Sequence, residues 1–157
     1  MFQPWQQPKV IKHSECLMRS YQHWTGHELL PRSSLSAESA RHLFEAPFVL
    51  VSHGIEPDPI LNYGNQPALK LWQLTWQELT CMPSRLTAEA PNREERAKLL
   101  ERVTRDGYIS DYSGVRIAKN GRRFLIKNAT VWNLRSESGA YCGQAAIFRE
   151  WKYINTF

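Results

Sequence analysis

The sequence lacks the features that mark secreted and membrane-spanning proteins. No apolar run is long enough to cross a bilayer, and the opening residues, MFQPWQQPKVIK, contain no apolar segment of signal-peptide length. The cysteines Cys16, Cys81 and Cys142 are odd in number and have no CxxC spacing, which favours free thiols in a reducing compartment over a disulfide framework. We therefore expect a cytoplasmic protein that does not contact a membrane.

Motifs of the common catalytic sites are missing as well. The sequence has no nucleophile elbow, no phosphate-binding glycine loop and no HExxH motif. The 20 basic residues are interspersed with 15 acidic ones, so the net charge of +5 favours acidic partners only weakly. A mixed-charge surface without a basic block does not indicate bulk nucleic-acid binding. We expect neither an enzyme nor a direct DNA-binding protein.

Four side chains in the first helical segment are of types that bind zinc. They are His13, Cys16, His23 and His27. Their spacing places them roughly on one face of a helix. This shared face is the reason to consider a metal site. Ligands strung along one helix span too great a length for a single ion, and Gly26 interrupts the last turn. A polar helix flank is the preferred interpretation, and no metal is expected.

The N-terminal part predicts a helix that needs a partner surface. The segment Lys9 to Leu30 has an apolar stripe at helical spacing, made of Val10, Leu17, Tyr21 and Trp24. Such a stripe must pack on the rest of the domain or on a second copy. The small polar residues from Arg32 to Glu38 form a predicted linker. We assign residues 1–35 to this helix and linker, and residues 36–157 to the main domain.

The rest of the chain reads as two strands, a helical middle and three further strands. The first two predicted strands cover Phe48–Ser52 and Ile60–Tyr63, and turn signals at Asn120-Gly121 and Ser138-Gly139 separate the last three. The predicted helices cover Ala37–Glu45, Gln66–Trp72 and Arg93–Asp106, the last of them capped by Asn92. This order predicts an α+β fold, with a five-stranded antiparallel sheet, helices on one face and a pocket between them.

The middle one of the three closing strands has apolar residues on both faces. One predicted face carries Phe124, Ile126, Asn128, Thr130 and Trp132. The other carries Leu125, Ala129 and Val131. An antiparallel sheet that is open to water on one side is polar there, so something must cover the second face. The N-terminal helix is the predicted cover. In the preceding strand, Tyr112 and Arg116 share a face.

Several stretches resemble the MEKHLA domain, a relative of the PAS sensory fold. They are APFVLVSH, DPILNYGN, PSRLTAE, NREERAKLL, DYSGVRI, GRRF, TVWNL and GQAAIF, spread over roughly His13 to Trp151. The family includes stand-alone bacterial proteins of about this size and the C-terminal part of plant class III homeodomain–leucine zipper factors. This chain has neither a homeodomain nor a zipper, so the resemblance does not imply DNA binding. It implies a PAS-like fold and a role in sensing or regulation.

The resemblance leaves the cofactor unknown. PAS-like domains hold a cofactor or metabolite between helices and sheet. In flavin photosensors of that superfamily a reactive cysteine follows a segment that resembles TWQEL, and Ser84 stands at that place here. Serine cannot form the adduct, because that chemistry needs sulfur. Haem-binding relatives commonly supply a histidine from the long central helix, and Arg93–Asp106 contains none.

Polar residues at pocket-compatible positions are the candidate ligand contacts. They are Ser84, Arg85, Asn128, Trp132 and Gln144. An amide on an apolar face, such as that of Asn128, must find partners, which are either a ligand or local backbone and buried water. Arg85 is compatible with an anion site made with backbone N–H groups, or with a salt bridge to Glu89 or another acid.

Two functions are compatible with these features. The first is a sensory or regulatory domain that binds a small molecule and signals through protein contacts. The alternative is a ligand-free protein-interaction or assembly module, suggested by the apolar residues Leu125, Ala129 and Val131 on the second face of the sheet. We also expect a homodimer built partly from the N-terminal helix, because large apolar stripes are seldom left in water.

Overall fold

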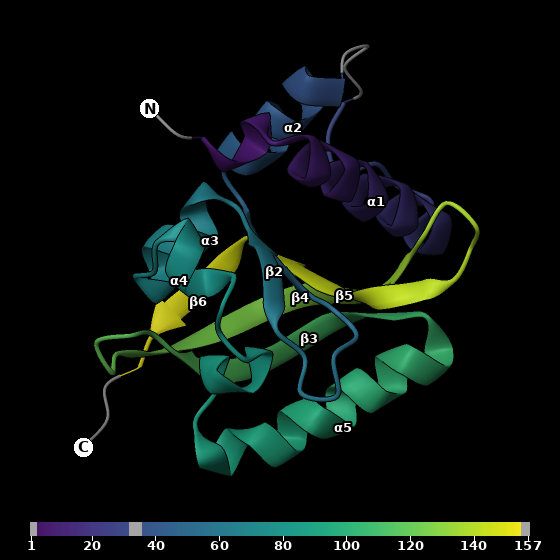
Figure 1. Cartoon of the computed structure of the whole chain (residues 1–157). Coiled ribbons are helices and arrows are strands. Elements are labelled where there is room, and N and C mark those ends of the chain that lie inside the picture. The colour runs from purple at the N-terminus through teal and green to yellow at the C-terminus, as the bar shows by residue number, and fades with distance from the viewer. Residues whose placement is uncertain (1–2, 32–35, 155–157) are drawn as a thin grey trace.

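An antiparallel sheet lies between two layers of helices in the computed structural model, which describes residues 3–31 and 36–154 (Figure 1). Its strands are β1 (Val49–His53), β2 (Leu61–Gly64), β3 (Tyr108–Ile117), β4 (Arg123–Arg135), β5 (Tyr141–Phe148) and β6 (Glu150–Tyr153). The strand order is β2-β1-β5-β4-β3, and the short β6 pairs with the first part of β4. The predicted α+β fold is confirmed, with β6 as an addition.

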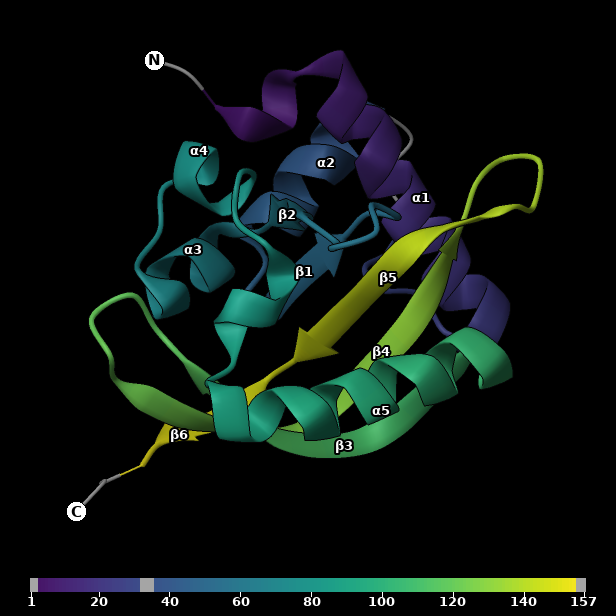
Figure 2. The ribbon, with the colours of Figure 1, turned by 60° about the horizontal axis from the view of Figure 1, so that its bottom comes forward.

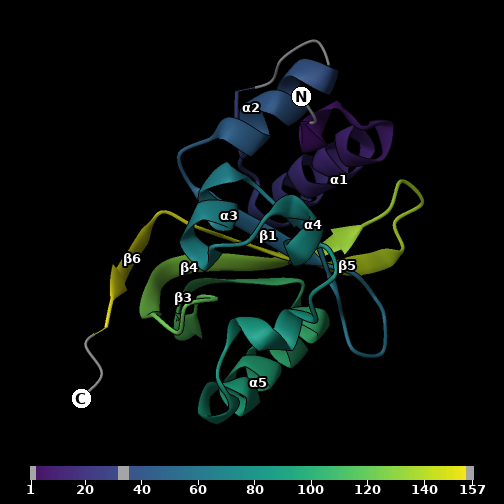
Figure 3. The same cartoon turned by 60° about the vertical axis from the view of Figure 1, so that its left-hand side comes forward.

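Helices cover both faces of this sheet. They are α1 (Pro8–Thr25), α2 (Ser36–Glu45), α3 (Gln66–Trp72), α4 (Trp76–Leu79) and α5 (Ala90–Asp106), with short 3-10 turns η1 (Pro4–Gln6) and η2 (Ser84–Thr87). The first two helices lie on one face and α5 lies on the other (Figures 2 and 3). Within the described residues, no helix is both long and apolar enough to cross a membrane.

Local signals place most helix ends, with two exceptions. Thr75 and Glu78 form a capping box at the start of α4. The helix α1 ends earlier than predicted, because Gly26 adopts a left-handed conformation with φ of 75°. The predicted cap of α5 is also wrong, since the Asn92 N–H already donates to the carbonyl of Glu89 inside the first turn.

A β-bulge at Asn128 decides which residues of β4 face which helices. Ile126 lies opposite Gly114 of β3, whereas Ala129 lies opposite Tyr112, so β4 contains one extra residue between these pairs. Asn128 has a φ of 52°. Beyond the bulge, Ala129 and Val131 pack with residues on the α5 side, and Trp132 and Leu134 pack on the α1 side. The predicted faces were wrong from this point on, because strict alternation fails at a bulge.

The helix α1 packs on its own sheet, which is one of the two arrangements predicted for the N-terminal helix, but it covers the face with Trp132 instead of the predicted face with Ala129 and Val131. Leu17 is fully buried, and the Tyr21 ring meets the Trp132 ring edge-on at 4.9 Å between centroids. The Trp24 indole N–H donates to the carbonyl of Asn133 at 2.9 Å. The apolar stripe is therefore used within the chain and does not itself call for a second copy. Of the predicted linker, residues 32–35 lie outside the described residues.

Candidate functional site

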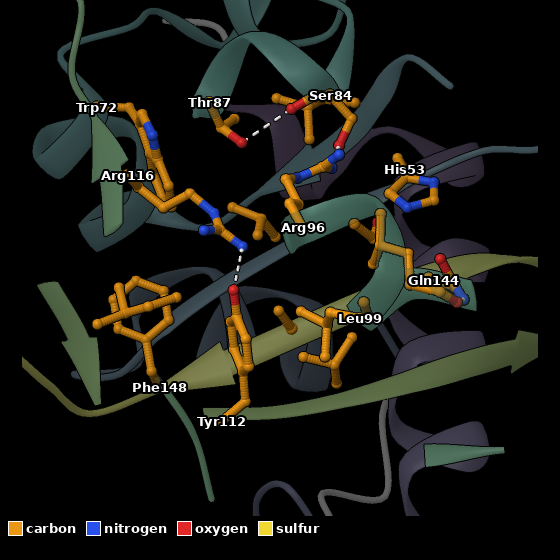
Figure 4. Close-up of a pocket in the computed structure, with 18 residues that line it drawn as sticks. His53, Trp72, Ser84, Thr87, Arg96, Leu99, Tyr112, Arg116, Gln144 and Phe148 are labelled. Carbon is orange, nitrogen blue, oxygen red and sulfur yellow. Dashed lines mark hydrogen bonds between the residues drawn. The ribbon is translucent and has the colours of Figure 1, made fainter. Parts of the chain in front are cut away.

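A small cavity lies between α5, η2 and the sheet (Figure 4). Its volume is about 60 Å³, room for about four or five water-sized groups. Much of the wall is apolar and comes from Trp72, Leu99, Ile126, Val131 and Phe148. Pockets for drug-sized ligands measure roughly 300–1,000 Å³, so this arrangement has room only for a much smaller molecule.

Ser84 and Arg96 form one side of the cavity. Ser84 is buried in η2, where its N–H donates to the carbonyl of Pro59 at 2.8 Å and its carbonyl accepts from the Thr87 hydroxyl at 2.8 Å. Its hydroxyl accepts a hydrogen bond from Nη2 of Arg96, which extends from α5. Burial, with a smaller contribution from the charge of Arg116, lowers the pKa of Arg96 to about 10. The guanidinium remains a cation at neutral pH.

Arg116 and Tyr112 of β3 form another side, and their predicted common face is confirmed. Arg116 is only 6% exposed, and its Nη2 donates to the Tyr112 hydroxyl at 3.1 Å. That hydroxyl donates to the exposed carboxylate of Glu95 at 3.0 Å. A Cβ atom on Gly114 would lie 2.2 Å from the hydroxyl and 3.1 Å from Nη1 of Arg116. Glycine at this position therefore makes room for the pair.

The two guanidinium groups share one cavity without an acidic partner. Among the described residues, no carboxylate forms a salt bridge with Arg96 or Arg116. Nearby arginines outside the cavity are paired, for example Arg123 with Glu89 at 2.7 Å. An isolated buried charge is costly unless it is paired and hydrogen-bonded. The cavity is therefore a confined region of positive charge.

Two further polar atoms in the cavity wall have no hydrogen-bond partner among the described residues. These are the indole N–H of Trp72 and Nε2 of His53, both buried. Burial lowers the pKa of His53, so the ring is neutral at pH 7. Its Nδ1 lies 3.0 Å from the carbonyl of Gly54 and must carry the proton, which leaves Nε2 as a free acceptor. A bound molecule or water is the normal solution for such atoms.

Gln144 connects the cavity wall to both helix layers. Its amide nitrogen lies 3.0 Å from the carbonyl of Leu100 and 2.9 Å from the hydroxyl of Thr104, both on α5. The same nitrogen lies 3.1 Å from Oδ1 of Asn133, the residue whose backbone carbonyl accepts from Trp24 of α1. A shift of the Gln144 side chain would therefore affect α5 through its own hydrogen bonds, and α1 through Asn133.

Two of the five predicted contact residues line the cavity and three do not. Ser84 and Gln144 are in its wall. Arg85 points away and is exposed, with its Nε 3.2 Å from Asp58, so the salt-bridge interpretation holds with Asp58 rather than Glu89. The anion site predicted for Arg85 is not formed by that residue.

The bulge in β4 explains the other two misplaced residues. Asn128 is exposed at the bulge, and its amide donates to Glu150 of β6 instead of entering the cavity. Trp132 is fully buried, but on the α1 face. Both were assigned to the inner face by counting alternate positions, and one extra residue reverses that count.

Sequence reasoning missed His53, Trp72 and Arg96 as cavity residues. Arg96 sits in a helix rich in charged residues, where arginine normally faces water. His53 directly follows an apolar run, which is a weak signal of burial. Arg116 had the clearest signal, since it shares a face with Tyr112 in an alternating strand. Nothing in the local pattern of the α5 helix distinguishes Arg96 from a surface arginine.

Metal binding gains no support from the described part of the chain, where no group of three His, Cys, Asp or Glu side chains is close enough to hold an ion. His13 instead contacts the Ser52 hydroxyl at 2.8 Å, and Cys16 lies 3.9 Å from Cys142. Wider hollows of about 410, 470 and 490 Å³ lie elsewhere. The small cavity differs from them in having two arginines in its wall, the half-buried Arg96 and the buried Arg116.

Comparisons with known proteins agree with this architecture. The MEKHLA domain model matches residues 11–153, from within α1 to the end of β6. The homeobox-leucine zipper protein REVOLUTA of Arabidopsis thaliana is 20% identical over 154 residues, which cover 94% of this chain but only 18% of that protein.

Two solved structures show the fold. The PAS domain of a protein from Colwellia psychrerythraea has a TM-score of 0.62 at 14% identity, covering 74% of this chain and 94% of that one. The light-state dimer of the fungal blue-light photoreceptor Vivid has a TM-score of 0.57 at 16% identity, covering 85% of this chain and 90% of that one. At these identities the likeness establishes a PAS fold.

Proposed function

Because the chain belongs to the MEKHLA domain family and has a PAS fold, we propose that it is a sensory or regulatory domain that binds a small molecule in the cavity under α5. The observation that carries the proposal is the pair of guanidinium groups of the half-buried Arg96 and the buried Arg116, which share a cavity without an acidic partner among the described residues. The unpartnered Trp72 N–H and His53 Nε2 support it. The role is binding rather than catalysis, and the location is the cytoplasm.

In this proposal, the domain transmits its signal through contacts with another protein. A ligand in the cavity touches the wall that Gln144 forms, and Gln144 is bonded to α5 and to Asn133. Asn133 in turn donates from its side chain to the carbonyl of Val103 and accepts from Trp24. Ligand contact with Gln144 would therefore alter the positions of the C-terminal part of α5 and of α1, whose outer surfaces are available to a partner.

Mass spectrometry of the native protein tests the ligand. The protein is purified from its own cells, denatured, and the released small molecules are identified. The variant A146L adds three carbon atoms at the cavity wall, and A97L adds the same atoms on the exposed side of α5. We expect one compound from wild type and A97L and its loss from A146L. If wild-type protein releases no compound and no metabolite in a screen raises its melting temperature, the proposed function is refuted.

A second candidate, an assembly module, is favoured by one observation. Trp151 and Tyr153 of β6 are each 38% exposed and contact each other, with 5.0 Å between ring centroids. The predicted apolar face of Leu125, Ala129 and Val131 does not support this candidate, because Ala129 and Val131 face α5. A homodimer through β6 is the proposed form. Light scattering of wild type and W151S/Y153S tests it, and a monomeric wild type at micromolar concentration would refute it.

A further inference from the structure

We propose that the ligand is a short-chain organic carboxylate, held by Arg96 and Arg116 with its carbon chain against the apolar wall. This inference deepens the proposed function and rests on it. Figure 4 shows the two guanidinium groups approaching the cavity from different sides, Arg96 beneath Ser84 and Arg116 above Tyr112. A group between them would contact a cation on each side.

The charge balance of the cavity requires an anion. Arg116 is 6% exposed, and its described hydrogen bonds go to two neutral oxygens, the Val115 carbonyl and the Tyr112 hydroxyl. Arg96 binds a neutral oxygen in Ser84. The nearest carboxylate in this network, that of Glu95, is exposed and is reached only through Tyr112. Neutral oxygens satisfy the N–H groups in part but leave both positive charges uncompensated.

The remaining polar atoms also favour an acceptor-rich head group. The Trp72 indole N–H is an unused donor, and the guanidinium groups have further N–H donors. A carboxylate accepts from several N–H groups at once and pairs well with planar guanidinium groups. A cationic or amine ligand would add a third positive charge to the same cavity. His53 Nε2, a buried wall atom without a hydrogen-bond partner among the described residues, can accept a hydroxyl hydrogen from the ligand.

The size and the wall of the cavity limit the rest of the molecule. A volume of about 60 Å³ suits about five non-hydrogen atoms, as in propionate. Apolar side chains such as Leu99, Ile126 and Val131 line the same cavity as the two arginines. Inorganic phosphate would contact the arginines but would leave these apolar side chains without contact. The wall therefore favours an organic acid over an inorganic anion.

A titration of the purified full chain tests this inference. Calorimetry in a chloride-free buffer compares acetate, propionate, pyruvate and lactate with propionamide, ethylammonium, chloride and inorganic phosphate. We expect at least one carboxylate to bind at least about tenfold more tightly than propionamide, which has the shape of propionate without its charge. Equal binding of propionamide and propionate, or tighter binding of chloride or phosphate than of every carboxylate, would overturn the inference.

Variants locate the binding. R96Q and R116Q remove one cation each, and R85Q removes an exposed cation from the adjacent turn. We expect the first two to weaken binding of the best carboxylate at least about tenfold and R85Q to leave it unchanged. Circular dichroism shows whether each variant is folded, and the ligand series on wild type does not depend on them. Equal affinity for wild type and a folded R96Q/R116Q double variant would overturn the inference.

The sensory function and the carboxylate ligand can be refuted separately. A neutral compound released from native protein would leave the sensory function standing and would overturn the carboxylate inference. A cavity that accepts no compound at all would overturn both.

Discussion

The two faces of the sheet are filled in different ways. On the α1 face, large apolar side chains such as Leu17, Leu50 and Trp132 are fully buried and pack against one another. On the α5 face, the corresponding space holds two guanidinium groups and a small cavity. Apolar packing contributes to stability, whereas buried unpaired cations detract from it. The helix α1 therefore stabilises the domain, and α5 covers the proposed ligand site.

Removing a core side chain from the α1 face should have the largest effect on stability. L17A deletes a fully buried side chain, so we expect a loss of about 2–5 kcal/mol in the free energy of unfolding by urea. I55A, at a residue that is 64% exposed, should change it by less than about 0.5 kcal/mol. Affinity of folded L17A for the best carboxylate should stay within about twofold of wild type. A small stability change in L17A would show that α1 does not anchor the fold.

Acid should weaken the α1 face through His13. Burial lowers the pKa of His13 to about 4 from the ordinary value of 6.5. The unfolded chain therefore takes up a proton at this residue before the folded chain does, and stability falls as pH drops from about 6.5 to 4. We expect about 2–3 kcal/mol of this loss to depend on His13.

Urea unfolding at a series of pH values, in wild type, H13Q and the exposed-site control H27Q, isolates that contribution. Protonation of carboxylates such as Glu78 and Glu89 also lowers the stability of the protein toward acid. Their pKa values are lowered mainly by hydrogen bonds from Lys119 and Arg123, respectively. Both carboxylates are present in all three proteins. Wild type should therefore lose about 2–3 kcal/mol more of its free energy of unfolding than H13Q does between pH 6.5 and 4. The same slope in wild type and H13Q would contradict the assignment.

A methyl group at Gly114 should disturb the α5 face alone. G114A places a Cβ 2.2 Å from the Tyr112 hydroxyl, so Tyr112 and Arg116 must move, at an expected cost of about 1–3 kcal/mol. Carboxylate affinity should fall with it. The control G54A meets only the flexible end of Glu56. Unchanged affinity in G114A would show that the position of Arg116 does not matter for binding.

Removing a charge from the exposed side of α5 should have the smallest effect on stability and on carboxylate affinity. Lys98 and Glu94 form an exposed pair at 3.8 Å, and such pairs contribute less than about 0.5 kcal/mol. K98Q should therefore leave both stability and carboxylate affinity near wild type, while R96Q, two residues earlier, should abolish most of the affinity. Equal effects of K98Q and R96Q would mean that general surface charge, rather than the cavity, attracts the anion.

The sequence predicted the architecture better than the site. Hydrophobic periodicity and turn signals were enough to predict the strands and the apolar stripe of α1, because these features depend on local patterns. The register beyond Asn128 was not predictable by alternation, since a single extra residue reverses the faces. Ser84 and Gln144 were placed in the cavity wall correctly, whereas the position of Arg96 in that wall depends on how α5 meets η2. That contact is tertiary and leaves no local signal.

The most direct test is site-resolved NMR of the side-chain N–H groups during a propionate titration. We predict saturable shifts for Nε–H of Arg96 and Arg116 and for the Trp72 indole N–H, with no shift for Nε–H of Arg85. The same additions of propionamide should leave all four signals in place. Shifts of Arg85 equal to those of Arg96 and Arg116, or no saturable shift at the cavity residues, would contradict an anion-binding cavity under α5.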